Sequence, residues 1–405
     1  MKMNELNSKI IYNTWATFIY FLSQWVLTII ITRISGYEVF GWYTFAVSFT
    51  NVFGYISRFG MHSFQVADVK REFDENQYYS SRIISSLFSI LFFLIVIAYE
   101  KYEHDITICC FMMMIYKTLE SFNDVFMGEM QRRDIYKKIA ISYSIKSFIT
   151  LAVFTILLLL KFPVYFCILG MSVSFLFIMI LYDCRELAVF ETFRIKTDGI
   201  GVLFIKCLPL ALSMILDSLI LFIPKHSIET VIGSEQLGYY GTVTIVIVVL
   251  STLGSSIWSS LIAFYSRSFI DNDRKTVIGL TLKIYLFFLI ISVFLFSIGR
   301  MIAPFFYSLL FGNKITDYMF LLPSVIANSL LLLFNSFYSC IFVPLKKNGF
   351  LLITNFLCLF VLLISCNQMT IDYGMLGASY SLGLALLFRF VILLISSALL
   401  ILKLP

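Results

Sequence analysis

Long apolar runs without charge restrict the fold of this chain more than any other feature. Four of them cover residues 10–32, 162–182, 236–266 and 318–345. A helix rises about 1.5 Å per residue, so each run is long enough to cross a hydrocarbon core of about 30 Å. The runs are continuous and do not alternate in the short segments of a transmembrane β-barrel. They predict an all-α membrane protein.

Composition agrees with a membrane protein, since 60% of the 405 residues are hydrophobic and 13% are charged. An ordinary soluble domain carries roughly 25% charged residues. The first apolar run is longer than a signal-peptide core and has no A-x-A-like cleavage site before Arg33, so we expect it to be a membrane span. The net charge of +6 is spread over the segments between spans and not gathered on one domain. This distribution argues against a nucleic-acid partner.

No motif for catalysis or for a bound cofactor stands out in the sequence. The eight cysteines are scattered without a C-x-x-C pair, and no Ser-His-Asp set, Gly-rich phosphate loop or metal-ligand spacing is present. We therefore expect neither an enzyme nor a protein with a metal ion or cofactor.

Charged and turn-rich breaks divide the chain into twelve predicted spans with short loops between them. Lys and Arg gather in the loops of one side, for example in the cluster Arg58, Lys70, Arg71 and Arg82, which places both termini in the cytoplasm. The predicted spans are 10–32, 39–58, 81–99, 105–126, 139–160, 162–182, 203–225, 236–262, 277–299, 317–343, 348–367 and 375–402.

An internal repeat is visible when the segment 35–43 is laid over the segment 232–240. Each segment links the first and second predicted spans of its half, and a second, looser similarity follows the fourth span of each half. Six spans per half give both halves the same orientation, as in transporters built from parallel repeats. We expect two six-helix lobes, residues 1–196 and 197–405. The identical pairs in the first alignment are Gly36/Gly233, Glu38/Glu235, Gly41/Gly238 and Tyr43/Tyr240.

The fourth predicted span carries Lys117, Glu120 and Asp124 at positions i, i+3 and i+7, on one helix face. Charge inside a membrane is costly, so such a stripe indicates a polar pathway through the bundle. The alternative is that Lys117 and Glu120 neutralise each other in a purely structural pair. A structural pair alone does not explain Asp124.

The seventh predicted span has Asp217 midway between Pro209 and Pro224. Proline removes a backbone donor and kinks a helix, so we expect a bent, gate-like helix at this point. Alternatively, Pro209 lies in the first helical turn, where proline is harmless.

Three further cations are candidates for binding an anionic head group. Lys146 lies within the fifth predicted span, and Arg33 and Arg58 end the first and second. One guanidinium group can bind two phosphate oxygens at the same time. The alternatives are that Lys146 extends toward the membrane interface and that the arginines anchor span ends there.

Several segments together resemble a known family. They are the stretch RISGYEVFGWY at 33–43, the Phe59-Gly60 ending of the second span, the basic stretch after the fourth span, and the sequence at 373–378. The chain resembles, over essentially its full length, the polysaccharide-transporter branch of the multidrug/oligosaccharidyl-lipid/polysaccharide (MOP) flippase superfamily, most of all Wzx-type O-antigen flippases.

The resemblance implies two six-helix lobes that alternate between inward-open and outward-open states. The resemblance further implies that the cargo is an undecaprenyl-pyrophosphate-linked oligosaccharide, an O-antigen or capsule unit, which is carried to the periplasmic leaflet of a bacterial inner membrane. A glycan polymerase and a chain-length regulator are implied partners beside membrane lipids. The pyrophosphate is expected at Lys117, Lys146, Arg33 and Arg58, and coupling to H+ or Na+ at Glu120, Asp124 and Asp217.

Three other functions compete with this one. A multidrug-extrusion antiporter of the same superfamily would favour acidic groups over this mixture of cationic and acidic side chains. An O-antigen polymerase would carry a large periplasmic loop, whereas the predicted external loops are short. A membrane scaffold without transport activity would not need a duplicated bundle with charged spans.

Overall fold

The computed structural model describes residues 3–68, 71–271 and 273–402. Almost all of these described residues are helical, and none of them lies in a strand. The chain divides into two compact units, Met1–Ser218 and Leu219–Pro405. We refer to them as unit 1 and unit 2 and describe each by itself.

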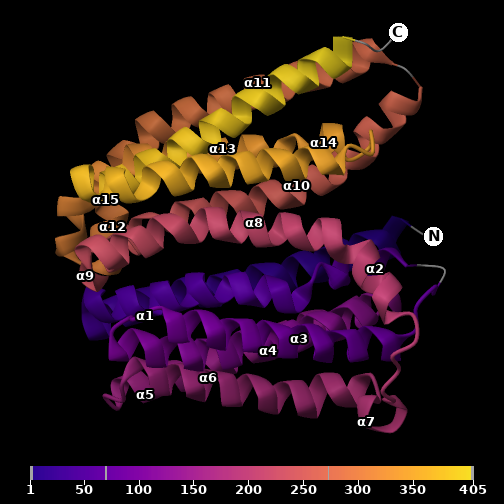
Figure 1. Cartoon of the computed structure of the whole chain (residues 1–405), viewed down its shortest axis with the longest axis horizontal. Helices are drawn as coiled ribbons and strands as arrows, with labels where there is room; N and C mark the ends of the chain where they lie inside the picture. The colour runs from indigo at the N-terminus through magenta and orange to yellow at the C-terminus, as the bar shows by residue number, and fades with distance from the viewer. Residues whose placement is uncertain (1–2, 69–70, 272, 403–405) are drawn as a thin grey trace. The chain divides into compact units, whose positions relative to one another are not determined.

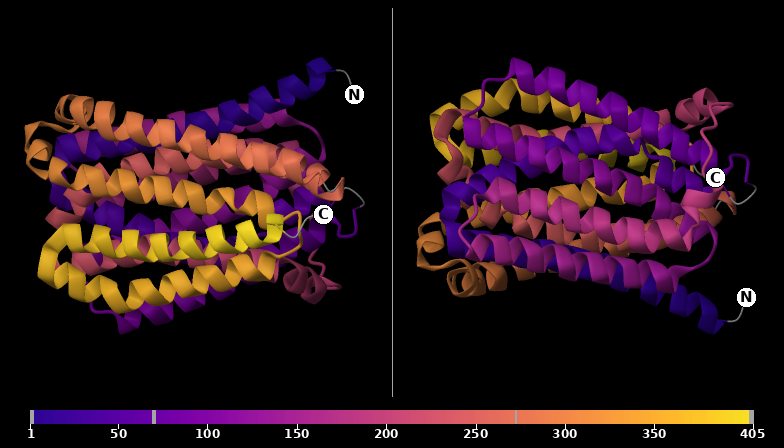
Figure 2. Two further views of the ribbon diagram at one scale, coloured as in Figure 1. Left: turned by 90° about the horizontal axis from the view of Figure 1, so that it is seen from above. Right: turned by 90° about the horizontal axis from the view of Figure 1, so that it is seen from below.

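Unit 1 is a bundle in which α1 packs against α3, α4 and α5, and α6 against α4 and α5 (Figures 1 and 2). Its elements are α1 (Met3–Arg58), α2 (Met61–Ala67), α3 (Glu75–Tyr99), α4 (His104–Arg132), α5 (Tyr136–Leu159), α6 (Val164–Ile178), the π-helical stretch η1 (Met179–Cys184), α7 (Val189–Thr192) and the first part of α8 (Ile200–Ile232).

Unit 2 is a second helical bundle, in which α13 packs against α10 and α15 (Figure 2). After the last part of α8, its elements are α9 (Ser234–Val243), α10 (Ile245–Ile270), α11 (Arg274–Phe294), the π-helical η2 (Leu295–Gly299), α12 (Arg300–Phe311), the 3-10 helix η3 (Asn313–Leu321), α13 (Leu322–Phe337), α14 (Ser339–Phe342) and α15 (Asn348–Leu402).

The helices agree with an all-α protein that crosses a membrane many times. Within the described residues, eight helical stretches are long and apolar enough to cross it, and two of them, Ile11–Ala67 and Asn348–Leu402, have 57 and 55 residues. At about 1.5 Å per residue, either is long enough for two crossings. Each of the twelve predicted spans lies within helical segments, with at most two residues outside them at either end. Helix α12 lies where only a loop was expected.

Glycines with left-handed backbone angles turn the chain between paired spans. Gly36 has φ 87° and ψ 179°, and Gly233, its partner in the sequence alignment, has φ 95° and ψ 173°. A third, Gly374 with φ 60°, interrupts α15 between the last two predicted spans. The matching geometry of Gly36 and Gly233 supports the internal repeat.

Serines hold α3 against the end of α1. The Ser85 hydroxyl donates to the Ser57 carbonyl at 2.6 Å, and the hydroxyls of Ser57 and Ser86 lie 2.7 Å apart. Ser89 donates to the carbonyl of Phe53 one turn earlier on α1. Small side chains allow close helix contact in a membrane, and their hydroxyls add bonds between helices.

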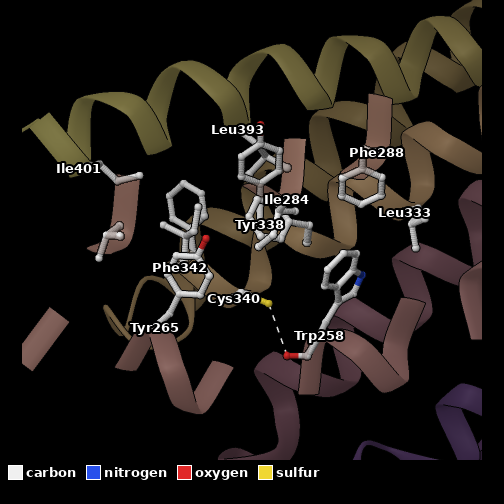
Figure 3. Packing of buried hydrophobic residues seen from close by; sticks show 13 residues of the cluster. Trp258, Tyr265, Ile284, Phe288, Leu333, Tyr338, Cys340, Phe342, Leu393 and Ile401 are labelled. Atoms are coloured by element: carbon white, nitrogen blue, oxygen red, sulfur yellow. Dashed lines mark hydrogen bonds between the residues drawn. The ribbon is translucent and has the colours of Figure 1, made fainter. Parts of the chain in front are cut away.

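Two asparagines join α13 to α15 in unit 2. Asn328 donates to the Ser379 carbonyl at 2.8 Å, and Asn335, two turns later, donates to the Leu386 carbonyl at 3.1 Å. Trp258 belongs to an apolar cluster in unit 2, where the thiol of Cys340 donates to the Trp258 carbonyl (Figure 3).

The segment before α8 is fastened to the start of α3 outside the membrane spans. Gln77 donates to the Asp198 carbonyl at 2.6 Å, and the Lys196 ammonium pairs with Asp74. Burial raises the pKa of Asp74, but bonds from Lys196 and from the Gln77 N–H outweigh that effect and hold the pKa below its usual value. Ionised Asp74 therefore stabilises this attachment.

We expect Gly36→Ala and Gly233→Ala each to lower the free energy of unfolding by about 1–3 kcal/mol, because these backbone angles are essentially restricted to glycine. No atom of the described residues lies within 4 Å of the added methyl group at either position, so backbone strain alone sets the cost. The matched control is Gly279→Ala in helical α11, also in open space. Thermal unfolding of the purified protein in detergent measures the effect. A Gly36→Ala protein as stable as the control would contradict the assignment.

We expect Asp74→Asn to destabilise the protein by at most about 1 kcal/mol near pH 7, because the ion pair is exposed. Asparagine caps a helix as well as aspartate, so the substitution isolates the charge. A carboxyl group whose pKa is lower in the folded than in the unfolded protein stabilises the fold fully above its unfolded pKa of about 3.9. This stabilisation is lost as the pH falls through the pKa of the folded state. The difference in melting temperature from wild type should shrink below about pH 4. A difference that does not change with pH would indicate another cause.

Candidate functional site

The carboxylate of Glu120 on α4 forms ion pairs with two cations inside unit 1. Its Oε2 atom accepts from Lys117 Nζ at 2.7 Å and from Arg58 Nη2 at 3.1 Å. Its Oε1 atom accepts from the Tyr20 hydroxyl on the first half of α1. Lys117 and Glu120 are buried, and Arg58 is about a quarter exposed. One carboxylate thus holds two cations in place.

Asp124 lies one turn further along α4 and has partners of its own. Its Oδ2 atom accepts from Arg82 Nη2 at 3.1 Å, and His62 Nδ1 lies 3.4 Å from Oδ1. His62 Nδ1 is also 2.8 Å from the Asp124 carbonyl, which only accepts, so this nitrogen carries the proton. Asp124 remains about a quarter exposed.

Arg82 is fully buried and joins three helices. Besides Asp124, it donates to the Ser57 carbonyl at 2.7 Å and to the Ser121 hydroxyl at 3.1 Å. The sequence grouped Arg82 with cytoplasmic cations, whereas the structure buries its side chain between helices. Helix α3 begins at Glu75, well before the predicted start of the span at 81, so Arg82 lies two turns inside the helix.

The structure brings Lys117, Glu120 and Asp124 onto one face of α4, as their spacing predicts. The Lys117–Glu120 pair that was considered as the structural alternative is present. Asp124 is accounted for by Arg82, whose role the sequence did not reveal. The stripe is therefore a set of linked ion pairs that includes Arg58.

Lys146 belongs to a second buried ion pair. Its ammonium bonds to Asp183 and to the side-chain oxygen of Asn123, and Ser142 donates to Asp183 at 2.7 Å. Lys146 and Asp183 are almost completely buried. Asp183 lies in η1, a kind of helical irregularity that is frequent at functional sites. Sequence reasoning missed it because it follows the predicted span 162–182 by one residue.

Arg33 and Asp217 are exposed side chains on α1 and α8. Arg33 ends the first half of α1, just before Gly36, whereas Arg58 ends the second half, about 33 Å along that half from Gly36. Pro209 is the tenth residue of α8, not part of its first turn, and α8 continues through both prolines. The candidates thus separate into the α4 cluster, the Lys146 pair and two exposed positions.

The two ion-pair clusters together hold one cation more than carboxylates. Within the two clusters, four cations face three carboxylates. The cations are Arg58, Arg82, Lys117 and Lys146, and the carboxylates are Glu120, Asp124 and Asp183. One of these cations, Arg58, is about a quarter exposed and therefore accessible to a ligand of negative charge.

Comparison with known proteins identifies the fold. No protein-family model matches the chain. The capsular polysaccharide biosynthesis protein CapF of Staphylococcus aureus is 23% identical over 369 residues, which cover 90% of this chain and 92% of CapF.

Two solved structures share the architecture at low identity. An inward-facing multidrug-resistance MATE transporter of the MOP superfamily matches with a TM-score of 0.74 and 13% identity, over 98% of each chain. A MOP-superfamily transporter from Pyrococcus furiosus, described as having a binding pocket of reversed polarity, matches with a TM-score of 0.60 and 12% identity, over 97% of this chain and 94% of its own. The chain has the fold of MOP-superfamily membrane transporters.

We expect Arg82→Leu to destabilise the protein by about 3 kcal/mol, because it leaves the partly buried carboxylate of Asp124 without its arginine. Arg82→Leu combined with Asp124→Leu should recover part of this loss. The matched control is Arg185→Leu at an exposed position. Chemical unfolding in mild detergent reports the difference. If Arg82→Leu is no less stable than the control, Arg82 does not join the helices as described.

Proposed function

We propose that this protein is a flippase that moves a lipid-linked oligosaccharide with a pyrophosphate head group, such as undecaprenyl-pyrophosphate-linked O-antigen or capsule units. The direction is from the cytoplasmic to the periplasmic leaflet of a bacterial inner membrane. The MOP transporter fold supports transport without chemistry on the cargo. Similarity to a capsular polysaccharide biosynthesis protein over 90% of the chain supports the saccharide class.

The convergence of two cations in unit 1 carries the proposal. Arg58 and Lys117 converge on a single carboxylate oxygen of Glu120, at 3.1 and 2.7 Å. This places their donors close enough together to contact one phosphate group. A site for cationic drugs would instead need more carboxylates than cations.

Glu120 acts in this proposal as an internal counter-anion. It neutralises Arg58 and Lys117 while no head group is bound, and an incoming phosphate replaces it as their partner. Tyr20, which donates to Glu120, offers the displaced carboxylate a remaining bond. Arg58 supplies the planar donor geometry that favours phosphate oxygens.

The position of the cluster suits loading from the cytoplasm. Arg58 ends the second span, Arg82 lies near the start of the third, and Asp124 near the end of the fourth. With both termini in the cytoplasm, as the distribution of Lys and Arg predicts, all three positions lie toward the cytoplasmic side. A head group made in the cytoplasm would therefore meet these cations on entry.

Lys146 is not part of the proposed phosphate site, because Asp183 and Asn123 already engage its ammonium. Arg33 and Asp217 are likewise outside it. Alternating access and coupling to H+ or Na+, with Glu120 and Asp124 as candidate carriers, belong to the proposal. The proposal also includes a glycan polymerase and a chain-length regulator as partners.

An ion-coupled multidrug-extrusion antiporter is the second candidate. The MATE structures with the same fold favour it, as do Glu120 and Asp124, two carboxylates on α4 that can bind cations or protons once their ion pairs open. It predicts lowered drug accumulation in cells and no dependence on a glycan pathway.

Complementation tests the two functions directly. In cells that lack their own saccharide flippase but contain a matching glycan pathway, wild type should restore surface glycan. Lys117→Gln and Arg58→Gln should lower it at least tenfold at equal membrane abundance, because each removes a phosphate donor. The control Lys101→Gln, at an exposed loop position, should remain active.

A double variant separates phosphate binding from folding. Lys117→Gln combined with Glu120→Gln leaves no buried unpaired carboxylate, so a loss caused only by a broken ion pair should be repaired. We expect the double variant to be abundant and inactive. Restored surface glycan in it would refute phosphate binding by Lys117. Lowered drug accumulation without glycan export in wild type would favour the antiporter.

A further inference from the structure

A groove runs along unit 1 between the neighbouring helices α3 and α4 (Figure 1). It holds about 540 Å³, a volume within the usual range of roughly 300–1,000 Å³ for small-ligand sites. Thr118 is the only polar side chain among the described residues that line it, and its hydroxyl donates to the Met114 carbonyl within α4. A lining of this kind suits a hydrocarbon chain.

The groove begins where the small side chains of α3 end. Ser85 and Ser89 donate to carbonyls of α1 and so bring the two helices close together. One turn after Ser89, the buried position on α3 is taken by Phe93. Its ring meets that of Phe111 on α4 edge to face, with centroids 5.4 Å apart. Large side chains therefore replace small ones at the level of the groove.

Buried and exposed side chains give the groove a floor and two sides. Phe93 and Met114 are buried and form the floor. Leu94 of α3 and Ile115 of α4 are 41% and 45% exposed and form the sides. A chain in the groove is in contact with protein on several sides, and the summed dispersion contacts distinguish it from fluid lipid.

The outer face of α3 identifies the surroundings as lipid. Residues 83–99 contain no charged side chain, and large apolar side chains are exposed all along residues 84–95. The helix is also long and apolar enough to cross a membrane. The occupant of the groove is therefore a lipid chain.

The length of the groove decides which lipid chain fits. Its lining on α4 runs from Ile108 to Leu119, about 16 Å along the helix. Half of a hydrocarbon core of about 30 Å is about 15 Å. One acyl chain of one leaflet matches this length, whereas an undecaprenyl chain is too long for it. With both termini in the cytoplasm, the loop between α3 and α4 is periplasmic, which places the groove in the periplasmic leaflet.

The charges at the periplasmic end of the groove indicate the head group. Three carboxylates, those of Glu100, Glu103 and Asp105, lie between the last residue of α3 and the first turn of α4, where Lys101 and His104 are the basic residues. Glu103 is exposed and precedes α4 without capping it through its side chain. Excess negative charge at this end favours a head group that carries an ammonium over an anionic one.

We propose that the groove binds one acyl chain of a periplasmic-leaflet phospholipid, and that Glu100 and Glu103 bind an ammonium on its head group. The site is separate from the proposed phosphate site and does not depend on which cargo the protein carries. A bound chain fills the space between α3 and α4. It stabilises unit 1 because the unfolded chain offers no such groove.

Native mass spectrometry of the purified, delipidated full chain in detergent tests the proposal. The probes are phosphatidylethanolamine and phosphatidylglycerol with the same acyl chains, and undecaprenyl phosphate. We expect the first phosphatidylethanolamine to bind at least about fivefold more tightly than the first phosphatidylglycerol, because its ammonium forms charge-assisted hydrogen bonds. This preference should fall below about twofold in the double variant Glu100→Gln/Glu103→Gln and persist in Glu191→Gln, at an exposed position outside the groove.

Filling the groove tests the position of the acyl chain. Leu94→Trp and Ile115→Trp should each weaken the first phosphatidylethanolamine at least about fivefold, because the larger ring takes the space of the chain. Both positions are partly exposed, so the larger ring can be accommodated. The matched control is Ile95→Trp, which lies at the same depth on α3, is 67% exposed and does not line the groove. It should bind phosphatidylethanolamine as wild type does.

Three outcomes overturn the proposal. Equal binding by the groove variants and Ile95→Trp means that only lipid on the general protein surface is measured. Equal affinity of wild type for phosphatidylethanolamine and phosphatidylglycerol refutes recognition of the ammonium. If undecaprenyl phosphate binds more tightly than phosphatidylethanolamine and loses that affinity in Leu94→Trp, the groove takes the polyprenyl chain instead of a phospholipid.

Discussion

The buried guanidinium of Arg82 is the interaction on which the rest of unit 1 depends. It bonds to a carbonyl in the last turn of α1, to a hydroxyl of α4 and to Asp124 of α4, while itself belonging to α3. The last carbonyls of a helix lack partners within that helix, so Arg82 and the Ser85 hydroxyl satisfy an acceptor that a membrane would leave unpaired. Three helices are thereby held in register at the level of Glu120.

That register places a set of charges where transport requires them. With α1 and α4 held together, Arg58 reaches the same carboxylate as Lys117, and Tyr20 approaches it from the other half of α1. A second buried pair joins α5 to η1 nearby without adding a free ligand for phosphate. The proposed phosphate site therefore rests on the two cations that share the Glu120 carboxylate, whereas Asp183 and Asn123 both engage the Lys146 ammonium.

The positions of the helices were more predictable from the sequence than the partners of individual side chains. The apolar runs located the spans, because burial in lipid demands continuous hydrophobic sequence of known length. The repeated glycines located two turns, because their backbone angles are open to little else. The face of α4 that carries Lys117, Glu120 and Asp124 followed from helical periodicity. Arg82 and Asp183 were missed because each lies at a predicted span end, where one turn more of helix changes a solvated charge into a buried one.

The sequence by itself determined that this is a multi-pass helical membrane protein with an internal repeat and a charged face on its fourth span. These properties depend on local composition and periodicity, which are written along the chain. Only the tertiary structure decided which charge neutralises which. Lys146 is committed to Asp183, 37 residues away, and Arg58 to Glu120, 62 residues away. Such pairings depend on how helices pack, and helix packing is set by contacts between side chains distant in sequence.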